Sequence, residues 1–379
     1  MDISIIIVSY NVKEYLRQCL TSVWASVRES GLSVEVFVVD NNSSDSSVEY
    51  IRECFPAASY PTLHVIAGRC NVGFGRANNL AVRQSKGKYI LFLNPDTVIT
   101  EHTLADCFRH AESHADVGAI GVKMLNVNGD FALESRRGLP TPWVAFCKMA
   151  GLGSLFPRSR TFGKYYMRYL DHNEAAEIEI VSGAFMFCSH SAIESCGVFD
   201  EQFFMYGEDI DLSYRFLKGK FHNWYVPTPI LHYKGESTHK GSYNYVHTFY
   251  EAMLIFFRKH FKTATLFLSI PVKIAIIGQA CWALMRQQTR ALGQYLYPNS
   301  LTRSPRLAWY DDNAVPQALV DLAELWDIKI VHDTPDVVAY DADALTYADM
   351  LQRLECSHQP IGFYYPSNGK LVLASRICE

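Results

Sequence analysis

The chain has 379 residues, of which 49% are hydrophobic and 20% are charged. These values are ordinary for a globular protein with a sizeable core, and the length predicts one large domain with additions. A formal net charge of −4 excludes the strongly basic class of nucleic-acid-binding proteins, so no nucleic-acid partner is expected and any phosphate binding must be local.

The ten cysteines form no CxxC pair and no Cys/His cluster at zinc spacing. Most, such as Cys19, Cys107 and Cys188, have apolar neighbours, which predicts buried free thiols in a reducing cytoplasm. The apolar run Ile3–Val8 ends at once in polar residues, so it is typical of a buried strand and not of a signal peptide.

Strand and helix patterns alternate over the first hundred residues. Strands are predicted at Ile3–Val8, Val34–Val39, Leu63–Ala67 and Tyr89–Leu93, and helices at Lys13–Val27, Ser46–Cys54 and Phe74–Ser85. Continuous apolar strands between helices predict a doubly wound, mostly parallel α/β sheet that is covered on both faces. Ligands bind such sheets at the carboxyl ends of the strands.

Each of these strands ends in polar or glycine-bearing residues. The ends are Ser9-Tyr10-Asn11, Asp40-Asn41-Asn42, Asn71-Val72-Gly73 and Asn94-Pro95-Asp96. Neither a GxGxxG sequence after the first strand nor a Walker A sequence is present, which disfavours an ordinary dinucleotide or P-loop site.

Two of these ends carry a carboxylate. Asp40 can accept hydrogen bonds from a base or ribose, or can simply serve as a turn or cap residue. Asp96 can coordinate a divalent cation that bridges phosphates, with Asn94 on the ribose, although Asn-Pro-Asp is also a common turn.

The middle of the chain, residues 117–229, shows a mixed pattern. Strands are predicted at Val117–Val122 and Ile178–Val181. Between them lies an irregular stretch, 134–171, which contains Arg136, Arg137, Arg158, Arg160, Lys164 and Arg168. This stretch is either a functional lid or a solvated basic loop.

The strongest local signal is an acidic cluster after an aromatic turn. Glu208, Asp209 and Asp211 crowd one short segment, and the apolar spacing that follows predicts a helix. Asp211 can cap this helix and pair with Arg215, which leaves the other two carboxylates near the cleft. Like charges there raise at least one pKa, which suits a general base, whereas the alternative is an ordinary acidic helix start.

His232 follows the strand-like run Trp224–Leu231. A single histidine is more often structural, but here Lys234, Ser237 and Thr238 follow it closely. Together these side chains could form a phosphate clamp with a cation ligand.

These blocks, taken in order over residues 1–260, resemble glycosyltransferase family 2 with the GT-A fold. The resemblance rests on Ser4-Ile-Ile-Ile-Val-Ser-Tyr-Asn11, Val39-Asp-Asn-Asn-Ser-Ser-Asp45, Asn71-Val-Gly-Phe-Gly-Arg-Ala-Asn-Asn79, Leu93-Asn-Pro-Asp-Thr97, Phe203-Phe-Met-Tyr-Gly-Glu-Asp-Ile-Asp211 and His232. The branch that looks most similar is that of bacterial rhamnosyltransferase-type enzymes, which build surface polysaccharides on lipid-linked acceptors.

The resemblance implies an inverting transfer from a dTDP-, UDP- or GDP-sugar with Mg²⁺ or Mn²⁺. Asp209 would be the catalytic base with Glu208 beside it, and Asp96 and His232 would hold the metal. The family's metal motif often reads Asp-x-Asp, but Asn94 takes the first place here, so His232 is expected as a second ligand. The residues expected at the donor nucleotide are Ser9, Tyr10, Asn11, Asp40, Asn42, Asn71, Gly73, Arg76, Asn79 and Asn94. Those expected at phosphate or acceptor are Arg136, Arg137, Asp211, Lys234 and Ser237.

Two segments follow this first domain. Residues 261–298 are apolar but interrupted by Lys273 and Pro271, so an in-plane amphipathic helix pair on a membrane is favoured over a crossing, with a soluble helix pair as the alternative. Residues 299–379 predict a small α/β module, resembling a shortened Rossmann-like domain, with either a regulatory or docking role or a purely structural one.

The sequence thus predicts a glycosyltransferase at the cytoplasmic face of the bacterial inner membrane, or in the cytoplasm, that acts on a lipid-linked glycan. Two other functions stay open at this point. A catalytically inactive sugar-nucleotide-binding regulator would bind donor without turnover. A sugar nucleotidyltransferase would release pyrophosphate, but its usual Gly-rich, basic phosphate loop is missing.

Overall fold

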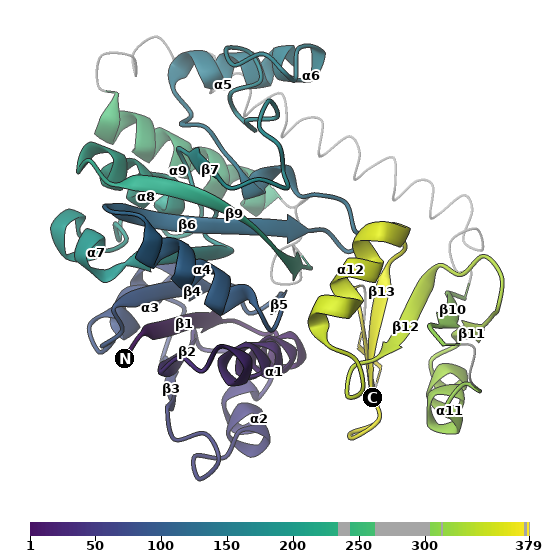
Figure 1. Cartoon of the computed structure of the whole chain (residues 1–379). Coiled ribbons are helices and arrows are strands. Elements are labelled where there is room, and N and C mark those ends of the chain that lie inside the picture. Colours follow the sequence, from purple (N-terminus) through teal and green to yellow (C-terminus); the bar gives the residue numbers. More distant parts are fainter. Residues whose placement is uncertain (234–242, 262–303, 312–313, 375–376, 379) are drawn as a thin grey trace.

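The computed structural model describes residues 1–233, 243–261, 304–311, 314–374 and 377–378, which form two sheets with their covering helices (Figure 1). Within these residues, no helix is both long and apolar enough to span a bilayer. The predicted helix pair at 261–298 lies outside the described residues except for its first residue, Phe261.

The first sheet has nine strands in the order β3-β2-β1-β4-β8-β6-β9-β5, with β7 paired to β9. The strands are β1 (Ile3–Ser9), β2 (Val34–Asp40), β3 (Leu63–Ala67), β4 (Tyr89–Leu93), β5 (Thr97–Ile99), β6 (Val117–Leu125), β7 (Ala176–Ile178), β8 (Phe185–Ser189) and β9 (His222–His232). The helices around it are α1 (Lys13–Ser30), α2 (Ser47–Cys54), α3 (Phe74–Val82), α4 (Thr103–Ser113), α5 (Pro142–Met149), α6 (Leu152–Leu155), α7 (His190–Cys196), α8 (Glu208–Lys218) and α9 (Tyr243–His260).

The α/β class is confirmed, but the expectation of a mostly parallel sheet is wrong beyond β4. The strands β3, β2, β1 and β4 are parallel neighbours. From there β8 runs antiparallel to both β4 and β6, and β9 is parallel to β6 but antiparallel to β5 and β7. The sheet is therefore mixed, because β8 reverses the direction at its centre.

Alternating side chains place one helix layer on each face of this sheet. In β1, Ile5 and Ile7 point into a core with α1, α2 and α4, whereas Ile6 and Val8 point into a second core with α3, α7 and α8. Because successive strand residues face opposite sides, an unbroken apolar strand is buried by helices on both faces, as the sequence predicts. Cys19, Cys107 and Cys188 are buried free thiols, also as predicted.

The predicted C-terminal α/β elements form a second, six-stranded sheet in the order β11-β10-β12-β13-β14-β15. Its elements are β10 (Arg306–Trp309), α11 (Gln317–Leu325), β11 (Lys329–Ile330), β12 (Val337–Asp341), α12 (Tyr347–Ser357), β13 (Ile361–Tyr365), β14 (Lys370–Leu373) and β15 (Ile377–Cys378). The first four strands in this order are parallel, and β14 and β15 close the sheet as antiparallel strands.

This C-terminal unit packs directly against the end of the first sheet that carries β5 and β9 (Figure 1). The two parts share one hydrophobic cluster, in which Met350 and Leu351 of α12 lie with Val98, Leu125 and Leu231 of the first sheet. Polar contacts surround this cluster: Lys123 pairs with Glu355 at 2.5 Å, Lys370 pairs with Glu14 at 2.7 Å, and the Arg17 guanidinium lies 4.6 Å from the Tyr365 ring centroid. A shared core of this kind couples the stability of the two parts.

The stretch 134–171, expected to be irregular, contains the short helices α5 and α6. Thr141 caps α5 by accepting a hydrogen bond from Val144 N at 3.3 Å, and Pro142 occupies the first helical position. Both are favourable helix-start residues. Thr141-Pro142 before the apolar run Trp143–Cys147 is therefore a helix-start signal in this stretch.

We predict that Leu351→Ala lowers the free energy of unfolding by about 2–4 kcal/mol, because it opens a cavity in the shared cluster. Urea unfolding monitored by circular dichroism should give one transition that moves as a whole. Leu325→Ala is the matched control, since Leu325 is 75% exposed and its truncation should change stability by less than about 0.5 kcal/mol. Two separate transitions, of which only one moves, would contradict the coupling.

Candidate active site

The carboxyl ends of the central parallel strands meet at one edge of the first sheet. The register pairs Ser9 with Asp40 across β1 and β2, and Ile7 with Leu93 across β1 and β4. The chain therefore leaves all three strands at nearly the same level. Because β8 is antiparallel to β4, its amino-terminal approach, Ser182-Gly183-Ala184, reaches the same edge.

A second strand pairing brings His232 beside Asp96. The short strand β5 pairs antiparallel with the end of β9, so that Thr97 faces His232, and Tyr233 N donates to Asp96 O at 3.0 Å. As a result His232 Nε2 lies 3.4 Å from Asp96 Oδ1, and both side chains are largely buried. His232 Nδ1 is also buried, and it has no hydrogen-bond partner within the described part of the chain.

The acidic cluster begins α8, whose amino terminus faces the same edge. Asp209 Oδ2 forms an ion pair with Arg137 and accepts a hydrogen bond from Gly183 N at 3.0 Å. Arg137 is fixed by an isolated bridge to Ile180, whose N–H donates to Arg137 O at 2.9 Å. Asp209 is therefore oriented by groups from two other segments.

Glu208 lies in a different environment from Asp209. Its carboxyl is buried, and Oε2 has no hydrogen-bond partner among the described residues. Burial, with the neighbouring Asp209 charge, raises the pKa of Glu208 to about 8. At neutral pH the carboxyl of Glu208 is thus mainly protonated, which makes it a proton donor or a base that acts above neutrality.

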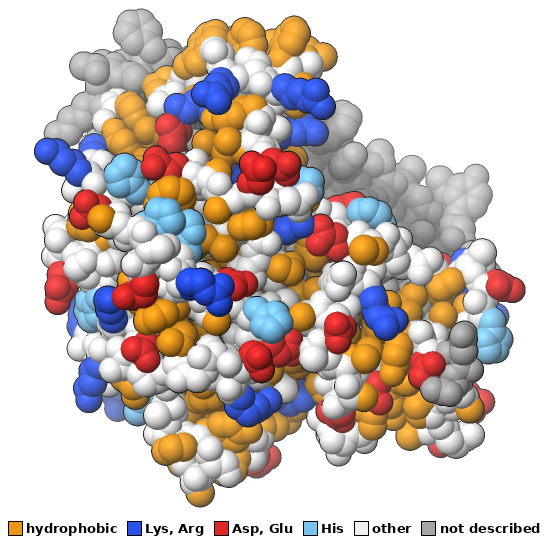
Figure 2. Space-filling model, viewed as in Figure 1, with side chains coloured by type: hydrophobic (Ala, Val, Ile, Leu, Met, Phe, Trp, Pro, Cys, Tyr) orange, Lys and Arg blue, Asp and Glu red, His pale blue; other side chains and the backbone are white. Residues whose placement is uncertain are grey.

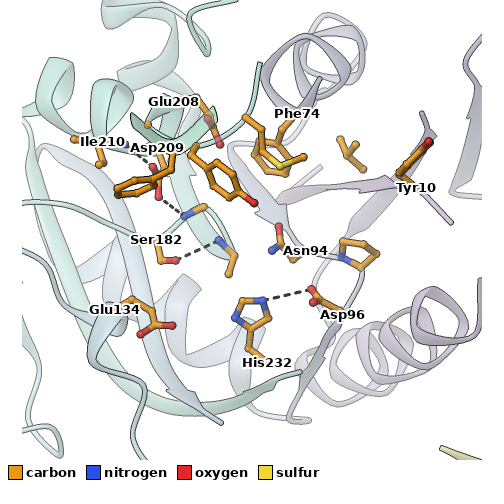
Figure 3. A pocket seen from close by; sticks show the side chains of 18 of the residues that line it. Tyr10, Phe74, Asn94, Asp96, Glu134, Ser182, Glu208, Asp209, Ile210 and His232 are labelled. Carbon is orange, nitrogen blue, oxygen red and sulfur yellow. Dashed lines mark hydrogen bonds and ion pairs between the residues drawn. The ribbon is translucent and has the colours of Figure 1, made fainter. Parts of the chain in front are cut away.

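These elements enclose a cavity of about 340 Å³, and Figure 3 shows the side chains that point into it. Of the residues predicted from sequence, the cavity is lined by Tyr10, Asn71, Asn94, Asp96, Arg137, Glu208, Asp209 and His232. The residues proposed for metal, base and ribose contacts therefore share one cavity, although they lie as much as 222 positions apart in the chain, from Tyr10 to His232. In the described chain, no group of three or more His, Cys, Asp or Glu side chains has the arrangement of a metal site.

Four polar residues of the lining were not predicted: Asn41, Glu134, Ser182 and Tyr206. Asn41 belongs to a strand end already recognised as polar, and its amide donates to Asn71 Oδ1 at 2.9 Å and accepts from Val72 N at 2.9 Å. The sequence pattern predicted a nucleotide contact for its neighbours Asp40 and Asn42 instead. Glu134 and Ser182 lie in segments without strand or helix periodicity, so no sequence signal marked them.

Five predicted nucleotide residues do not line the cavity but build the turns behind it: Ser9, Asn11, Asp40, Asn42 and Gly73. Asn11 and Asn42 adopt positive φ angles of 54° and 67°, which asparagine tolerates. Asp40 Oδ2 accepts from Ser43 N at 3.0 Å, whereas its buried Oδ1 has no partner in the described chain. That orphaned oxygen keeps Asp40 a candidate for a ligand contact.

The predictions for Arg76 and Asn79 are not supported by the geometry. Asn79 is buried on α3 and donates to Phe199 O at 2.9 Å. Arg76 is 57% exposed and lies 3.4 Å from Glu201. These side chains fasten α3 to the loop after α7 rather than lining the cavity.

Arg136 was predicted to contact phosphate or acceptor, and the structure contradicts this. Its guanidinium donates to the carbonyl oxygens of Leu170 and Asp171 at 2.8 and 2.7 Å and stacks on the rings of Phe131 and Tyr225. Because this side chain is buried, Arg136 is a structural residue. Of the two adjacent arginines, Arg137 alone lines the cavity.

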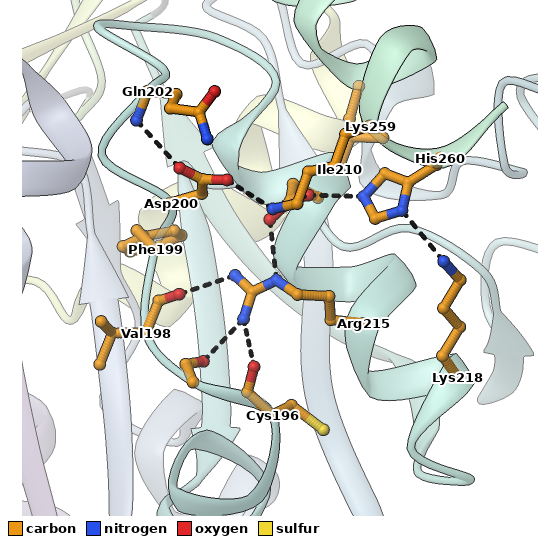
Figure 4. Close-up of polar contacts among 12 residues, drawn as sticks. Cys196, Val198, Phe199, Asp200, Gln202, Ile210, Arg215, Lys218, Lys259 and His260 are labelled. Carbon is orange, nitrogen blue, oxygen red and sulfur yellow. Dashed lines mark hydrogen bonds and ion pairs between the residues drawn. The ribbon is translucent and has the colours of Figure 1, made fainter. Parts of the chain in front are cut away.

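The assignment of Asp211 to phosphate or acceptor is also wrong. Its carboxylate is fully buried and pairs with Arg215, Lys259 and His260 at 2.8, 2.8 and 2.6 Å. Figure 4 labels these three partners. Burial alone would raise the pKa of Asp211, but hydrogen bonds from Lys259 and the charge of Arg215 outweigh it and lower the pKa. Asp211 therefore ties α8 to α9. The other two predicted phosphate residues, Lys234 and Ser237, lie outside the described residues.

The edge of the sheet thus combines polar strand ends, a carboxylate–imidazole pair and an acidic helix start in one cavity, an arrangement suited to nucleotide-sugar chemistry. The sequence model of glycosyl transferase family 2 matches residues 4–197, just over half of the chain. The chain belongs to this family and is a glycosyltransferase, which excludes the nucleotidyltransferase alternative.

Named relatives act in glycan synthesis. The chain is 25% identical over 264 residues to the N-acetylglucosaminyl-diphospho-decaprenol L-rhamnosyltransferase of Mycobacterium tuberculosis, covering 66% of this chain and 82% of that protein. It is 29% identical over 218 residues to a low-salt glycan biosynthesis hexosyltransferase of Haloferax volcanii, covering 56% and 61%. Among solved structures, a mannosyltransferase from Pyrobaculum calidifontis shares 15% identity with a TM-score of 0.47, over 79% of this chain and 81% of that one.

We predict that Glu208→Gln flattens the pH dependence of stability. Between pH 4.5, the ordinary pKa of glutamate, and a pH of about 8, the folded wild type keeps a proton on Glu208. The unfolded chain releases this proton in the same pH range. The contribution of Glu208 to stability should therefore be highest below pH 4.5, and should fall by about 4 kcal/mol as the pH rises to 8.

The measurement is urea unfolding at a series of pH values. Glu208→Gln should remove this slope, whereas the control Glu174→Gln, at an exposed position, should keep it. An unchanged slope in Glu208→Gln would show that another group is responsible.

Proposed function

We propose that this chain is an inverting transferase that moves a sugar from a nucleoside diphosphate to a hydroxyl group of a lipid-linked glycan in cell-surface polysaccharide synthesis. The observation that carries the proposal is the shared cavity of Asp96, His232, Glu208 and Asp209. The M. tuberculosis relative, named for an acceptor on diphospho-decaprenol, supports the lipid-linked acceptor. This enzyme would act at the cytoplasmic face of the bacterial inner membrane.

Tyr10, Asn71 and Asn94 would bind the nucleoside part of the donor, with Asp40 behind them. Tyr10 is 40% exposed and offers an aromatic face to a base, while the two amides offer donors and acceptors to ribose. The cavity wall formed by Gly183 and Gly207 leaves room next to Asp209, because a side chain at Gly183 would press on the Asp209 Cβ at 3.3 Å. The donor would be a dTDP-, UDP- or GDP-sugar.

Asp96 and His232 would hold a divalent cation, Mg²⁺ or Mn²⁺. The fit is supported by their donor set, since carboxylate oxygen and neutral imidazole both ligate Mn²⁺, and by the 3.4 Å between Asp96 Oδ1 and His232 Nε2 in the buried site. When bound, the cation supplies positive charge to the leaving diphosphate.

Asp209 would act as the base that takes the proton from the acceptor hydroxyl as it attacks the anomeric carbon. Arg137 and Gly183 N hold this carboxylate in one orientation, which favours a defined line of attack. In-line displacement by the hydroxyl inverts the anomeric configuration. Glu208 would keep a proton beside Asp209 and so reduce the like charge there.

The donor is identified by incubating purified protein with a panel of nucleotide sugars, with and without membrane extract, and measuring release of nucleoside diphosphate. Release that needs both one donor and the extract supports transfer to a membrane-derived acceptor. Donor binding without any release, over the whole panel, would instead support the inactive-regulator alternative.

We predict that Asp209→Asn lowers the transfer rate by about 10²–10⁴-fold and changes the Kd for donor by less than about three-fold. The amide keeps the shape of the side chain but cannot accept the proton. Asp130→Asn is the control, because Asp130 is a surface carboxylate with a side chain that is 64% exposed. A fully active Asp209→Asn enzyme would remove this residue from the role of base.

A second prediction concerns His232. His232→Gln should raise the Mn²⁺ concentration needed for half-maximal activity by about ten-fold or more, since one of two protein ligands is lost. Calorimetric titration of Mn²⁺ in the presence of nucleoside diphosphate should show the same shift. His102→Gln, at an exposed position, is the control, and an identical metal titration for both variants would exclude His232 from the metal site.

A further inference from the structure

The segment that carries α5 and α6 exposes large apolar side chains, which are normally buried in a globular protein. Trp143, Phe146, Leu155 and Phe156 are between 51% and 70% exposed. On α5 the buried positions are Val144 and Cys147. The helix is therefore apolar on its inner face and again on its outer face.

These side chains form one continuous surface rather than scattered contacts. The rings of Trp143 and Phe146 stack with centroids 5.7 Å apart, Phe156 lies 5.5 Å from Phe162, and Trp143 lies 6.4 Å from Phe162. Figure 2 shows hydrophobic side chains gathered at the end of the molecule where α5 and α6 lie in Figure 1, with lysine and arginine side chains beside them. Large exposed apolar patches rimmed by charge mark interaction sites.

The charge of this segment has one sign. Between Gly138 and Leu170 there is no Asp or Glu, but there are five basic residues, in a chain with a net charge of −4. Three of them, Arg158, Arg160 and Arg168, are exposed and have no ion-pair partner within the described part of the chain. A cationic rim around exposed aromatic rings complements an anionic lipid surface, where rings enter the interfacial layer and cations meet phosphate groups.

The base of this segment is fastened to the wall of the active-site cavity. Arg137, which pairs with Asp209, directly precedes it, and Gly138 N donates to Tyr165 O at 3.0 Å. Leu139 and Ala145 pack on the cluster of Phe203 and Phe256 below. A surface on α5 and α6 would thus lie beside the entrance through which an acceptor must come.

We infer that the α5–α6 surface, defined by Trp143, Phe146, Leu155, Phe156, Arg158 and Arg160, docks the protein on an anionic phospholipid bilayer. Its purpose, to bring the cavity to a lipid-linked acceptor, rests on the proposed function, but binding to the bilayer does not need turnover. This surface is distinct from residues 261–298, where the sequence alone predicted membrane contact.

The test is co-sedimentation of the full chain, without donor, with vesicles of phosphatidylcholine alone or of equal parts phosphatidylcholine and phosphatidylglycerol. The expected result is preferential binding to the anionic vesicles. The triple variant Trp143→Ser, Phe146→Ser, Phe156→Ser should bind the vesicles at least about ten-fold more weakly than the wild type, because it loses the inserted apolar surface. The double variant Arg158→Glu, Arg160→Glu should lose the preference for anionic vesicles.

The matched controls carry the same kinds of change elsewhere. Arg28→Glu with Arg52→Glu reverses two exposed charges on α1 and α2, and Leu80→Ser with Leu325→Ser removes two exposed apolar side chains. All variants are checked for folding by circular dichroism, and their release of nucleoside diphosphate without vesicles reports separately on the proposed function.

Two results would overturn the inference. One is vesicle binding by the α5–α6 variants equal to that of the control variants. The other is sedimentation velocity showing a dimer that the triple serine variant abolishes, since the surface would then be an interface between two copies of the chain.

Discussion

The active-site cavity depends on the pairing of a three-residue strand, β5, with the end of β9. This pairing brings Asp96, which follows the central strand β4, beside His232, which lies 136 positions later in the chain. Its backbone hydrogen bonds continue to Tyr233 N and Asp96 O, so the two side chains are fixed by main-chain geometry on both sides. With their main chains fixed and both side chains largely buried, the carboxylate and the imidazole meet at 3.4 Å, and such preorganisation is what a metal site needs.

Neighbouring carboxylates in the acidic helix start have opposite environments for a local reason. Successive residues in the first turn of a helix point in different directions, so Asp209 reaches Arg137 and Gly183 whereas Glu208 turns into a buried site without a partner. Asp209 is thereby paired with a guanidinium, whereas the raised pKa of Glu208 keeps that carboxyl mainly protonated at neutral pH. Asp211, two residues after Asp209, points away from the cavity and pairs with Arg215 of α8 and with Lys259 and His260 of α9. The three carboxylates form one motif in the sequence, but in the structure Glu208 and Asp209 line the cavity whereas Asp211 has a structural role.

The parts of this architecture that follow from local pattern were predictable. The bounds of β3 and β4 agree with the predicted strands Leu63–Ala67 and Tyr89–Leu93, because short apolar runs between polar ends have a strong local signal. The short strand β5 and the reversal at β8 were missed, since a run of three residues has no periodicity and strand direction is decided by tertiary pairing.

The same limit explains the site residues. Strand-end polar residues could be proposed from the chain direction of a parallel sheet, but whether a side chain turns into the cavity or back into its own loop is set by packing. Arg136 and Arg137 are adjacent and chemically identical, yet one stacks on Phe131 and the other reaches Asp209. The isolated bridge between Arg137 and Ile180 decides this alternation, and nothing in the local sequence encodes it.

The C-terminal unit has a direct physical connection to the same strand pair. Tyr233, next to His232, donates to Gln18 Oε1 at 2.8 Å, and its ring lies 5.0 Å from that of Tyr15. Tyr15 in turn donates to the carbonyl of Leu373 in β14 at 3.3 Å. The outer side of the β5–β9 pairing, at Val98 and Leu231, is fully buried in the hydrophobic cluster that it shares with the C-terminal unit, and water is excluded from it. Excluding water strengthens the hydrogen bonds of this pairing, so the C-terminal unit is part of what holds His232 in place, and a purely appended domain would not share a core with the strands that carry the site.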